Sequence, residues 1–185
     1  MKNTVKIISC IGALVLSGLA SAVEAQTDAL LYISQNNYQH IRHPYYSDYW
    51  FEQGPMLEPI AFAALNAKEG GVTLCTANET NNTVIRIQPS VFYNPQMQIY
   101  HGKLVATVYS GGGNVLGTYT GKAQQIGFLG GDKVNRYYLN KVYTSAMQDL
   151  MTKLKIDPVL ESAKAENKLP CGFIGAQADR RINFY

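Results

Sequence analysis

Two histidines spaced three residues apart, His40 and His43, come closest to a chemical site by type and spacing. On one helical turn such a pair can share a metal ion, and Asp48 or His101 would complete the ligand set. Pro44 follows directly and interrupts the helix that would align the pair. A solvated aromatic loop is therefore the main interpretation. A small secreted hydrolase or a metal-binding protein that uses His40, His43 and His101 is the alternative hypothesis.

A dense group of aromatic rings surrounds these histidines in the sequence. Exposed amphipathic rings are common at binding surfaces, because they bury a large area at a small cost in side-chain entropy. The rings predict a surface that contacts a sugar, a peptide or a partner domain, unless they fold back and close the open end of a sheet. The candidate binding residues are Tyr38, Tyr45, Tyr46, Tyr49, Trp50 and Phe51.

Nothing else in the sequence predicts a reaction. A Gly-X-Ser-X-Gly nucleophile elbow is absent. The run Gly111-Gly-Gly113 stands between two predicted strands, where a tight turn is a simpler explanation than a phosphate cradle. Glu52 and Glu58 are near each other in sequence, but no pattern fixes them as a catalytic pair of carboxylates. We therefore expect no catalytic residue, no metal and no cofactor, in a protein that is not an enzyme.

The N-terminus has the parts of an export signal. Residues 1–6 are a short basic start, and residues 7–20 are an apolar run that is too short for a membrane span. Val23-Glu-Ala25 is a small-residue cleavage sequence, and Ala20-Ser-Ala22 is a second candidate. We expect residues 1–25 to be a signal peptide cleaved after Ala25, which predicts a periplasmic or secreted mature chain without a membrane span.

Two cysteines, Cys75 and Cys171, remain after the signal peptide is removed with Cys10. An even pair in an exported chain predicts a disulfide, with two buried thiols as the alternative. The bond would tie the C-terminal tail, residues 168–185, back to an early strand. A lipid anchor on Cys10 is not expected, because too little apolar sequence precedes it.

Composition and charge narrow the class of protein further. The chain of 185 residues is 46% hydrophobic and 16% charged, which fits one globular domain. The mature part carries 14 Lys and Arg against 12 Asp and Glu, a formal charge of +2. This excess is too small and too evenly spread for nucleic-acid binding.

The longest structural pattern is a β-hairpin followed by a helix. Residues 97–109 and 115–126 are rich in β-branched and aromatic residues, and the glycine-rich residues 110–114 supply the turn. Apolar side chains at helical spacing predict a helix over residues 139–154. A two-stranded hairpin alone is marginal in water, so this helix is expected to cover one face of a sheet.

Shorter elements flank the hairpin. One helix is expected to begin at Pro59 and to end at the Gly70-Gly71 pair, and a second is expected to begin at Asp157-Pro158. In the strand over residues 84–93, Pro89 predicts a bulge, a break or an edge position. The expected strands are residues 29–34, 72–76 and 84–93, the expected helices 59–69 and 158–167, and the expected loop 35–51.

This order predicts an α+β fold in a single domain, residues 26–167. The expected architecture is a mainly antiparallel sheet of about 4–5 strands with two or three helices packed on one face.

The hairpin and helix also carry a family resemblance. Lys103-Leu-Val-Ala-Thr-Val-Tyr-Ser-Gly-Gly-Gly-Asn114, then Gly117-Thr-Tyr-Thr-Gly-Lys122 and residues 140–167, resemble the YajG-type and LptE-type periplasmic lipoprotein families. These families share a small α/β sandwich with the ABC-transport auxiliary lipoproteins, and the resemblance covers roughly residues 61–167. It implies a non-catalytic accessory or assembly protein of the bacterial cell envelope that binds an envelope protein partner, with membrane association left open. The partner would bind to the aromatic loop or to an exposed sheet edge by strand addition. The cysteine pair, the aromatic loop and the lack of an expected lipid attachment depart from the family.

Overall fold

The computed structural model describes residues 29–34, 38–41, 48–67, 71–75, 79–154 and 169–173. The expected signal peptide, the expected helix over 158–167 and most of the tail lie outside the described residues, so they stay predictions.

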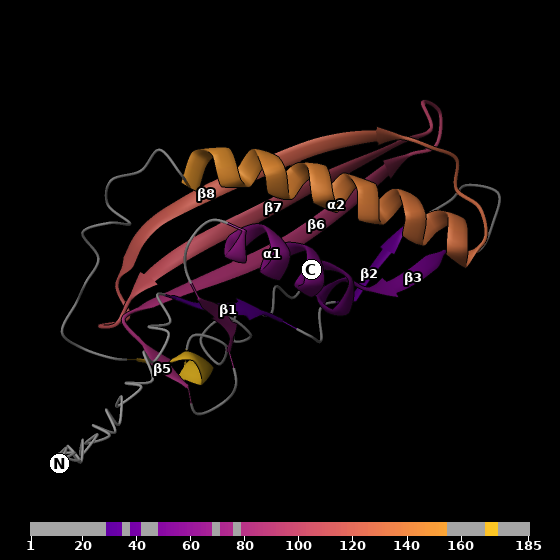
Figure 1. Ribbon diagram of the computed structural model, residues 1–185. Helices are drawn as coiled ribbons and strands as arrows, with labels where there is room; N and C mark the ends of the chain where they lie inside the picture. The colour runs from indigo at the N-terminus through magenta and orange to yellow at the C-terminus, as the bar shows by residue number, and fades with distance from the viewer. Residues whose placement is uncertain are drawn as a thin grey trace, which may run out of the picture.

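Five strands form the main sheet, in the order β4-β1-β6-β7-β8 (Figure 1). The strands β6, β7 and β8 are antiparallel neighbours, whereas β1 is parallel to both β4 and β6. The α+β class is confirmed, but the sheet is mixed rather than simply antiparallel. Their bounds are β1 Ala29–Ile33, β4 Val72–Leu74, β6 Thr83–Asn94, β7 Ile99–Ser110 and β8 Val115–Ile126.

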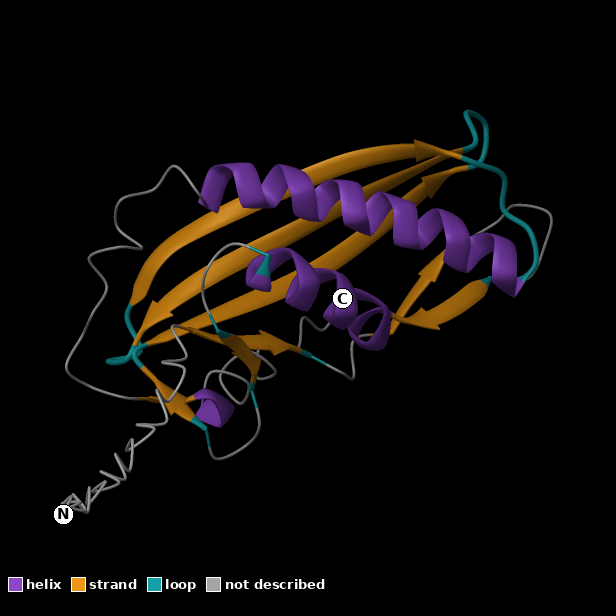
Figure 2. Ribbon diagram, in the orientation of Figure 1, coloured by secondary structure: helices purple, strands orange, loops and turns teal. Residues whose placement is uncertain are grey.

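Two helices lie on one face of this sheet, as predicted, and form a second layer (Figure 2). The helix α2, Asp132–Leu154, covers β7 and β8. The helix α1, Gln53–Asn66, covers β1 and β4 and also contacts α2. The core lies between the layers, and its largest fully buried members include Leu31, Leu57, Ile87, Tyr100, Leu104, Leu139, Tyr143 and Leu150.

The helix α2 approaches β8 very closely where the strand has a glycine. A Cβ atom placed on Gly121 would lie 2.1 Å from the backbone oxygen of Ala146. Next to this contact, the side chain of Asp149 accepts a hydrogen bond of 2.9 Å from the backbone N–H of Lys122, and Lys153 donates to the backbone oxygen of Thr120. Charged side chains of α2 therefore cover part of the free edge of β8.

The first helix begins earlier than predicted. The expected start at Pro59 is wrong, because α1 runs from Gln53 and includes Pro59 in its interior. Pro55 lies in the first turn, where the missing N–H has no helical partner to lose. Burial of Met56, Leu57, Ala61 and Leu65 against the sheet outweighs the helix-breaking tendency of Pro59.

The strand β6 passes through Pro89 without interruption. Pro89 pairs with Leu104 of β7, while β1 on the other side pairs with β6 only as far as Ile87. Pro89 therefore lies beyond the end of the pairing between β1 and β6. Of the three positions predicted for this proline, the edge position agrees with the structure, because the missing N–H has no strand to pair with on that side.

The C-terminal segment is tied to the opposite face of the sheet by the predicted disulfide. Cys75 and Cys171 are bonded, with their Cα atoms 5.8 Å apart. Cys171 packs against Leu30 and Val84, which point away from the helices, and opens a short helical turn at residues 171–173. The two-residue strands β5, Thr80–Asn81, and β9, Leu169–Pro170, pair beside it.

Candidate functional site

The predicted aromatic loop contains a β-hairpin of its own. The strands β2, Tyr38–Ile41, and β3, Tyr49–Glu52, pair antiparallel, with Gln39 opposite Phe51 and His40 opposite Trp50. The expectation of a loop over residues 35–51 is therefore wrong for both segments. Side chains alternate between the two faces of a strand, so the aromatic rings are divided between a buried and an exposed face.

The inner face of this hairpin anchors it to the main sheet. Ile41 and Phe51 are buried in the common core, and the ring of Tyr49 stacks on Phe51 with 5.6 Å between centroids. The side-chain amide of Gln39 donates a 3.4 Å hydrogen bond to the backbone oxygen of Val91 in β6. The inner rings therefore fold back onto the end of the sheet, as the second interpretation of the aromatic cluster predicted.

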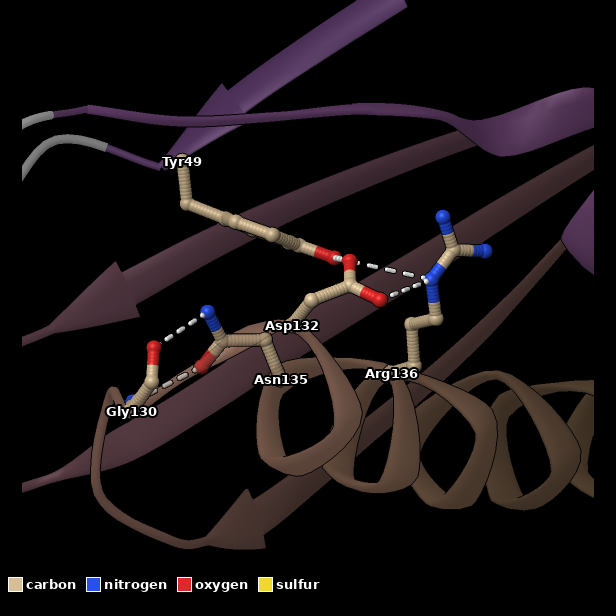
Figure 3. Close-up of polar contacts among 5 residues, drawn as sticks. All are labelled: Tyr49, Gly130, Asp132, Asn135 and Arg136. Atoms are coloured by element: carbon tan, nitrogen blue, oxygen red, sulfur yellow. Dashed lines mark hydrogen bonds and ion pairs between the residues drawn. The ribbon is translucent and has the colours of Figure 1, made fainter.

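A polar contact joins the hairpin to the start of α2 (Figure 3). The hydroxyl of Tyr49 donates a 2.7 Å hydrogen bond to Asp132, and Nε of Arg136 lies 2.9 and 3.0 Å from the same carboxylate. The bond from Tyr49, followed by those from Arg136, holds the pKa of Asp132 below its usual value. Burial, and then the contact with Asp132, raise the pKa of Tyr49 to about 12.

The loop that leads into α2 is fixed by a buried asparagine. Asn135 accepts a 2.9 Å hydrogen bond from the backbone N–H of Gly130 and donates one of the same length to its oxygen (Figure 3). The hydroxyl of Tyr100 donates a further bond of 3.2 Å to Asn135. These bonds fix the position of Asp132, which accepts the hydrogen bond from the hydroxyl of Tyr49.

The variant Tyr49→Phe tests this link. A lowered pKa means that Asp132 stabilises the fold above its unfolded pKa of about 3.9, and that this contribution is lost as the pH falls through the folded value. Removal of the hydroxyl is expected to raise the folded-state pKa of Asp132, so its contribution to stability becomes smaller and is fully lost at a higher pH. An NMR titration of the Asp132 carboxyl measures the change. Tyr38→Phe is the matched control, and superimposable Asp132 curves for wild type and Tyr49→Phe would contradict the assignment.

The outer face of the hairpin presents two large rings to solvent. Tyr38 and Trp50 are 61% and 62% exposed. The hydroxyl of Tyr38 donates a 2.7 Å hydrogen bond to Glu52, which is the first cause of a raised pKa of Tyr38. His40 stacks on Trp50 with 4.6 Å between ring centroids. These neighbours hold both rings in place although they are exposed.

A groove of about 480 Å³ runs beside these rings, between the hairpin and the two helices. The terminal amino groups of Arg136 point away from Asp132, whereas its Nε faces that carboxylate (Figure 3). The groove thus combines aromatic surface with an acid, a base and an amide. Its lining includes Tyr38, Trp50, Glu52, Pro55, Arg136 and Asn140.

The histidines proposed as metal ligands have other neighbours in the structure. His40 stacks on Trp50 in the hairpin, and His101 lies against Phe92 on the main sheet, 5.8 Å away between centroids. In the described residues no three side chains of His, Cys, Asp or Glu form a group able to hold a metal ion. His43, Tyr45 and Tyr46 lie outside the described residues, so their predicted roles stay predictions.

No family model and no curated protein matches this chain. Solved structures share part of its arrangement. A protein of Xanthomonas campestris that carries the family model DUF330 has a TM-score of 0.48 and 11% identity, covering 69% of this chain and 85% of that chain. The PelC dodecamer of Paraburkholderia phytofirmans has a TM-score of 0.40 and 14% identity, covering 67% and 89%. A predicted lipoprotein of Caulobacter crescentus has a TM-score of 0.38 and 10% identity, covering 74% and 90%.

None of the three is named for the YajG, LptE or ABC-transport auxiliary families, so the finer family resemblance stays a prediction. Within the described segments, neither helix combines the length and the hydrophobicity that a bilayer crossing requires.

Proposed function

We propose that this protein is a non-catalytic accessory protein of the bacterial cell envelope that binds a protein partner through the outer face of the aromatic hairpin. The observation that carries the proposal is the pair Tyr38 and Trp50. Both rings are largely exposed, yet Tyr38 is held by a hydrogen bond to Glu52 and Trp50 by stacking with His40. Ordered, exposed rings lose little conformational entropy when a partner covers them.

The rest of the hairpin supports this role. Its inner face is fixed to the core by Phe51 and to α2 by the contact between Tyr49 and Asp132, so the outer face is presented on a rigid base. Tryptophan, tyrosine and arginine are the residue types that most often dominate the binding energy of protein interfaces. The groove places Arg136 beside both rings, with polar groups around them that suit the rim of an interface.

A protein partner fits this surface better than a small molecule. Small-molecule sites enclose most of the ligand surface within a concave pocket. Here Tyr38 and Trp50 stand on the outside of a hairpin with more than half of their surface in solvent. The periplasmic or secreted location is part of the proposal and rests on the export signal in residues 1–25.

Affinity capture with the full mature chain tests the proposal. Trp50→Ala, alone and with Tyr38→Ala, is expected to lower recovery of a discrete envelope protein by roughly 30-fold, the effect of a loss of about 2 kcal/mol at an interface hot spot. The free energy of unfolding is expected to change by only about 0.5 kcal/mol, since both rings are exposed.

Tyr137→Ala is the matched control, because Tyr137 is an exposed ring on α2, 54% accessible. It is expected to leave recovery unchanged. Quantitative mass spectrometry of material captured from envelope extracts gives the ratios. Equal recovery by wild type and the Trp50 variant would refute the proposed surface, and collapse of the fold in both hairpin variants would show that the rings belong to the core.

A further inference from the structure

The face of the sheet that points away from the helices carries ordered rows of side chains at the end near the β6–β7 turn. The strand register places Ser90, Lys103 and Lys122 in one row across β6, β7 and β8. The next row toward the turn is Phe92, His101 and Gln124, and the third is Asn94, Ile99 and Ile126. Alternate residues of the same strands face α2, as Gly102 and Gly121 show by their contacts with that helix.

The first row is basic and lacks compensating acid within the sheet. Lys103 and Lys122 stand directly opposite each other, an arrangement that is unfavourable without an anionic partner. The sequences of β1, β4, β6, β7 and β8 contain no Asp or Glu. On the neighbouring helix, the carboxylate of Asp149, whose pKa is lowered by Lys153 and in smaller part by the charge of Lys122, is already engaged by Lys153 at 2.6 Å. This row therefore provides positive charge for an external anion.

Beyond that row, the end of the sheet exposes large apolar side chains beside the polar His101, Gln124 and Asn94. Ile126 is 72% exposed, and Phe92 and Met97 are each 63% exposed. Met97 lies in the β6–β7 turn, which projects at the tip of the sheet (Figure 1). The turn is ordered, because the side chain of Asn94 accepts hydrogen bonds from the backbone N–H groups of Gln96 and Met97.

The distance between the charged and apolar rows suits a lipid surface. Lys122 and Ile126 are four residues apart on one strand, which corresponds to about 13 Å. Apolar groups of interfacial proteins enter about 5–10 Å into the boundary between headgroups and acyl chains. With Met97 and Ile126 at that depth, Lys103 and Lys122 lie at the level of the lipid phosphates.

We propose that this tip of the sheet, defined by Lys103, Lys122, Phe92, Met97 and Ile126, is a docking surface for an anionic phospholipid bilayer. The two lysines contact the phosphates, and the apolar side chains enter the headgroup region. This surface is separate from the proposed partner site, because it lies on the outer face of the main sheet and includes no residue of the aromatic hairpin. Trp50→Ala is accordingly expected to leave lipid binding intact.

Vesicle flotation with the mature chain tests the docking surface. The protein is expected to float with vesicles of phosphatidylcholine mixed with phosphatidylglycerol, and not with phosphatidylcholine alone. Lys103→Gln with Lys122→Gln is expected to weaken partitioning roughly 30-fold, and added salt to weaken wild-type binding as well. Ile126→Ser is expected to weaken it at least about tenfold.

Two control variants make the same kinds of substitution outside the proposed docking surface. Val115→Ser removes an apolar side chain, 58% exposed, at the opposite end of β8, and Lys141→Gln removes a lysine from α2. Neither is expected to change partitioning. Absence of flotation with anionic vesicles, equal binding to neutral vesicles, or equal losses in Val115→Ser and Ile126→Ser would each overturn the proposal.

A fluorescence measurement reports the depth of the tip independently of affinity. Trp50 is the single tryptophan of the chain, so Ile126→Trp in a Trp50→Phe background places one probe at the tip. Its emission is expected to shift to shorter wavelength when anionic vesicles are added. Val115→Trp in the same background is expected to show no shift, and an unshifted probe at position 126 would contradict insertion.

Discussion

Replacing both cysteines, Cys75→Ser with Cys171→Ser, is expected to lower the free energy of unfolding by about 4–5 kcal/mol. The bond closes a loop across a sequence separation of 96 residues, and on the chain-entropy model a loop of this length restricts the unfolded chain strongly. In the folded protein, the bond also holds Cys171 in the small cluster with Leu30 and Val84. The two-residue pairing of β5 with β9 also connects this segment to its surroundings, as does a 3.0 Å hydrogen bond from the backbone N–H of Cys171 to the backbone oxygen of Glu79.

Urea denaturation followed by circular dichroism measures this loss. The wild-type protein treated with reductant is the control, because it should match the double variant in unfolding midpoint. Mass spectrometry without reductant verifies that the untreated protein has no free thiol in the mature chain. Equal stabilities for oxidised and reduced wild type would contradict a stabilising bond.

Gly121→Ala is expected to have the second-largest effect, a loss of about 3 kcal/mol. The added Cβ would lie 2.1 Å from the backbone oxygen of Ala146 and 2.7 Å from Cβ of Leu150. Both obstacles are rigid parts of α2, so the helix must move away from β8. That movement would open the core around Leu104 and Leu150, both of which are fully buried.

Gly112→Ala provides the comparison for this substitution. Gly112 lies in the β7–β8 turn, where the nearest heavy atom to an added Cβ is 3.7 Å away on Asn114. We expect its unfolding midpoint in urea to stay close to that of wild type. Equal midpoints for Gly112→Ala and Gly121→Ala would show that the contact between α2 and β8 is looser than the structure indicates.

The local parts of the fold could be predicted from the sequence. The hairpin of β7 and β8 is formed by neighbouring segments of alternating pattern, and the return strand was expected at residues 115–126, where β8 lies. The disulfide could be predicted from the even number of cysteines that remain after the expected signal peptide. The fold class could also be predicted, because a succession of strands with a long amphipathic helix favours a layered α+β fold.

The parts that depend on distant contacts were not predictable in the same way. The parallel placement of β1 requires α1 as a crossover, and short strands carry no local signal of direction. The N-terminal turns of α2 are rich in polar residues such as Lys133 and Arg136, so the apolar stripe alone placed its start too late. Asn135 is polar yet buried, because its bonds to Gly130 replace those to water.

The aromatic cluster was predicted in part: its membership could be predicted from the sequence, but its division between a buried and an exposed face could not. The sequence identified the rings as a group but not their alternation, since Pro44 and the absence of a clear period suggested a loop. Pairing of β2 with β3 places Phe51 in the core and Trp50 in solvent. The inner face of the hairpin therefore belongs to the core, and the proposed binding surface is its exposed outer face.

The central proposal, that the outer face of this hairpin holds a protein partner, is tested most directly by site-specific photo-crosslinking in living cells. A photoreactive amino acid replaces Trp50 in one strain and Tyr137 in another. We predict one discrete covalent adduct to an envelope protein from position 50 and none from position 137. No adduct at position 50, or the same adduct at both positions, would contradict the account.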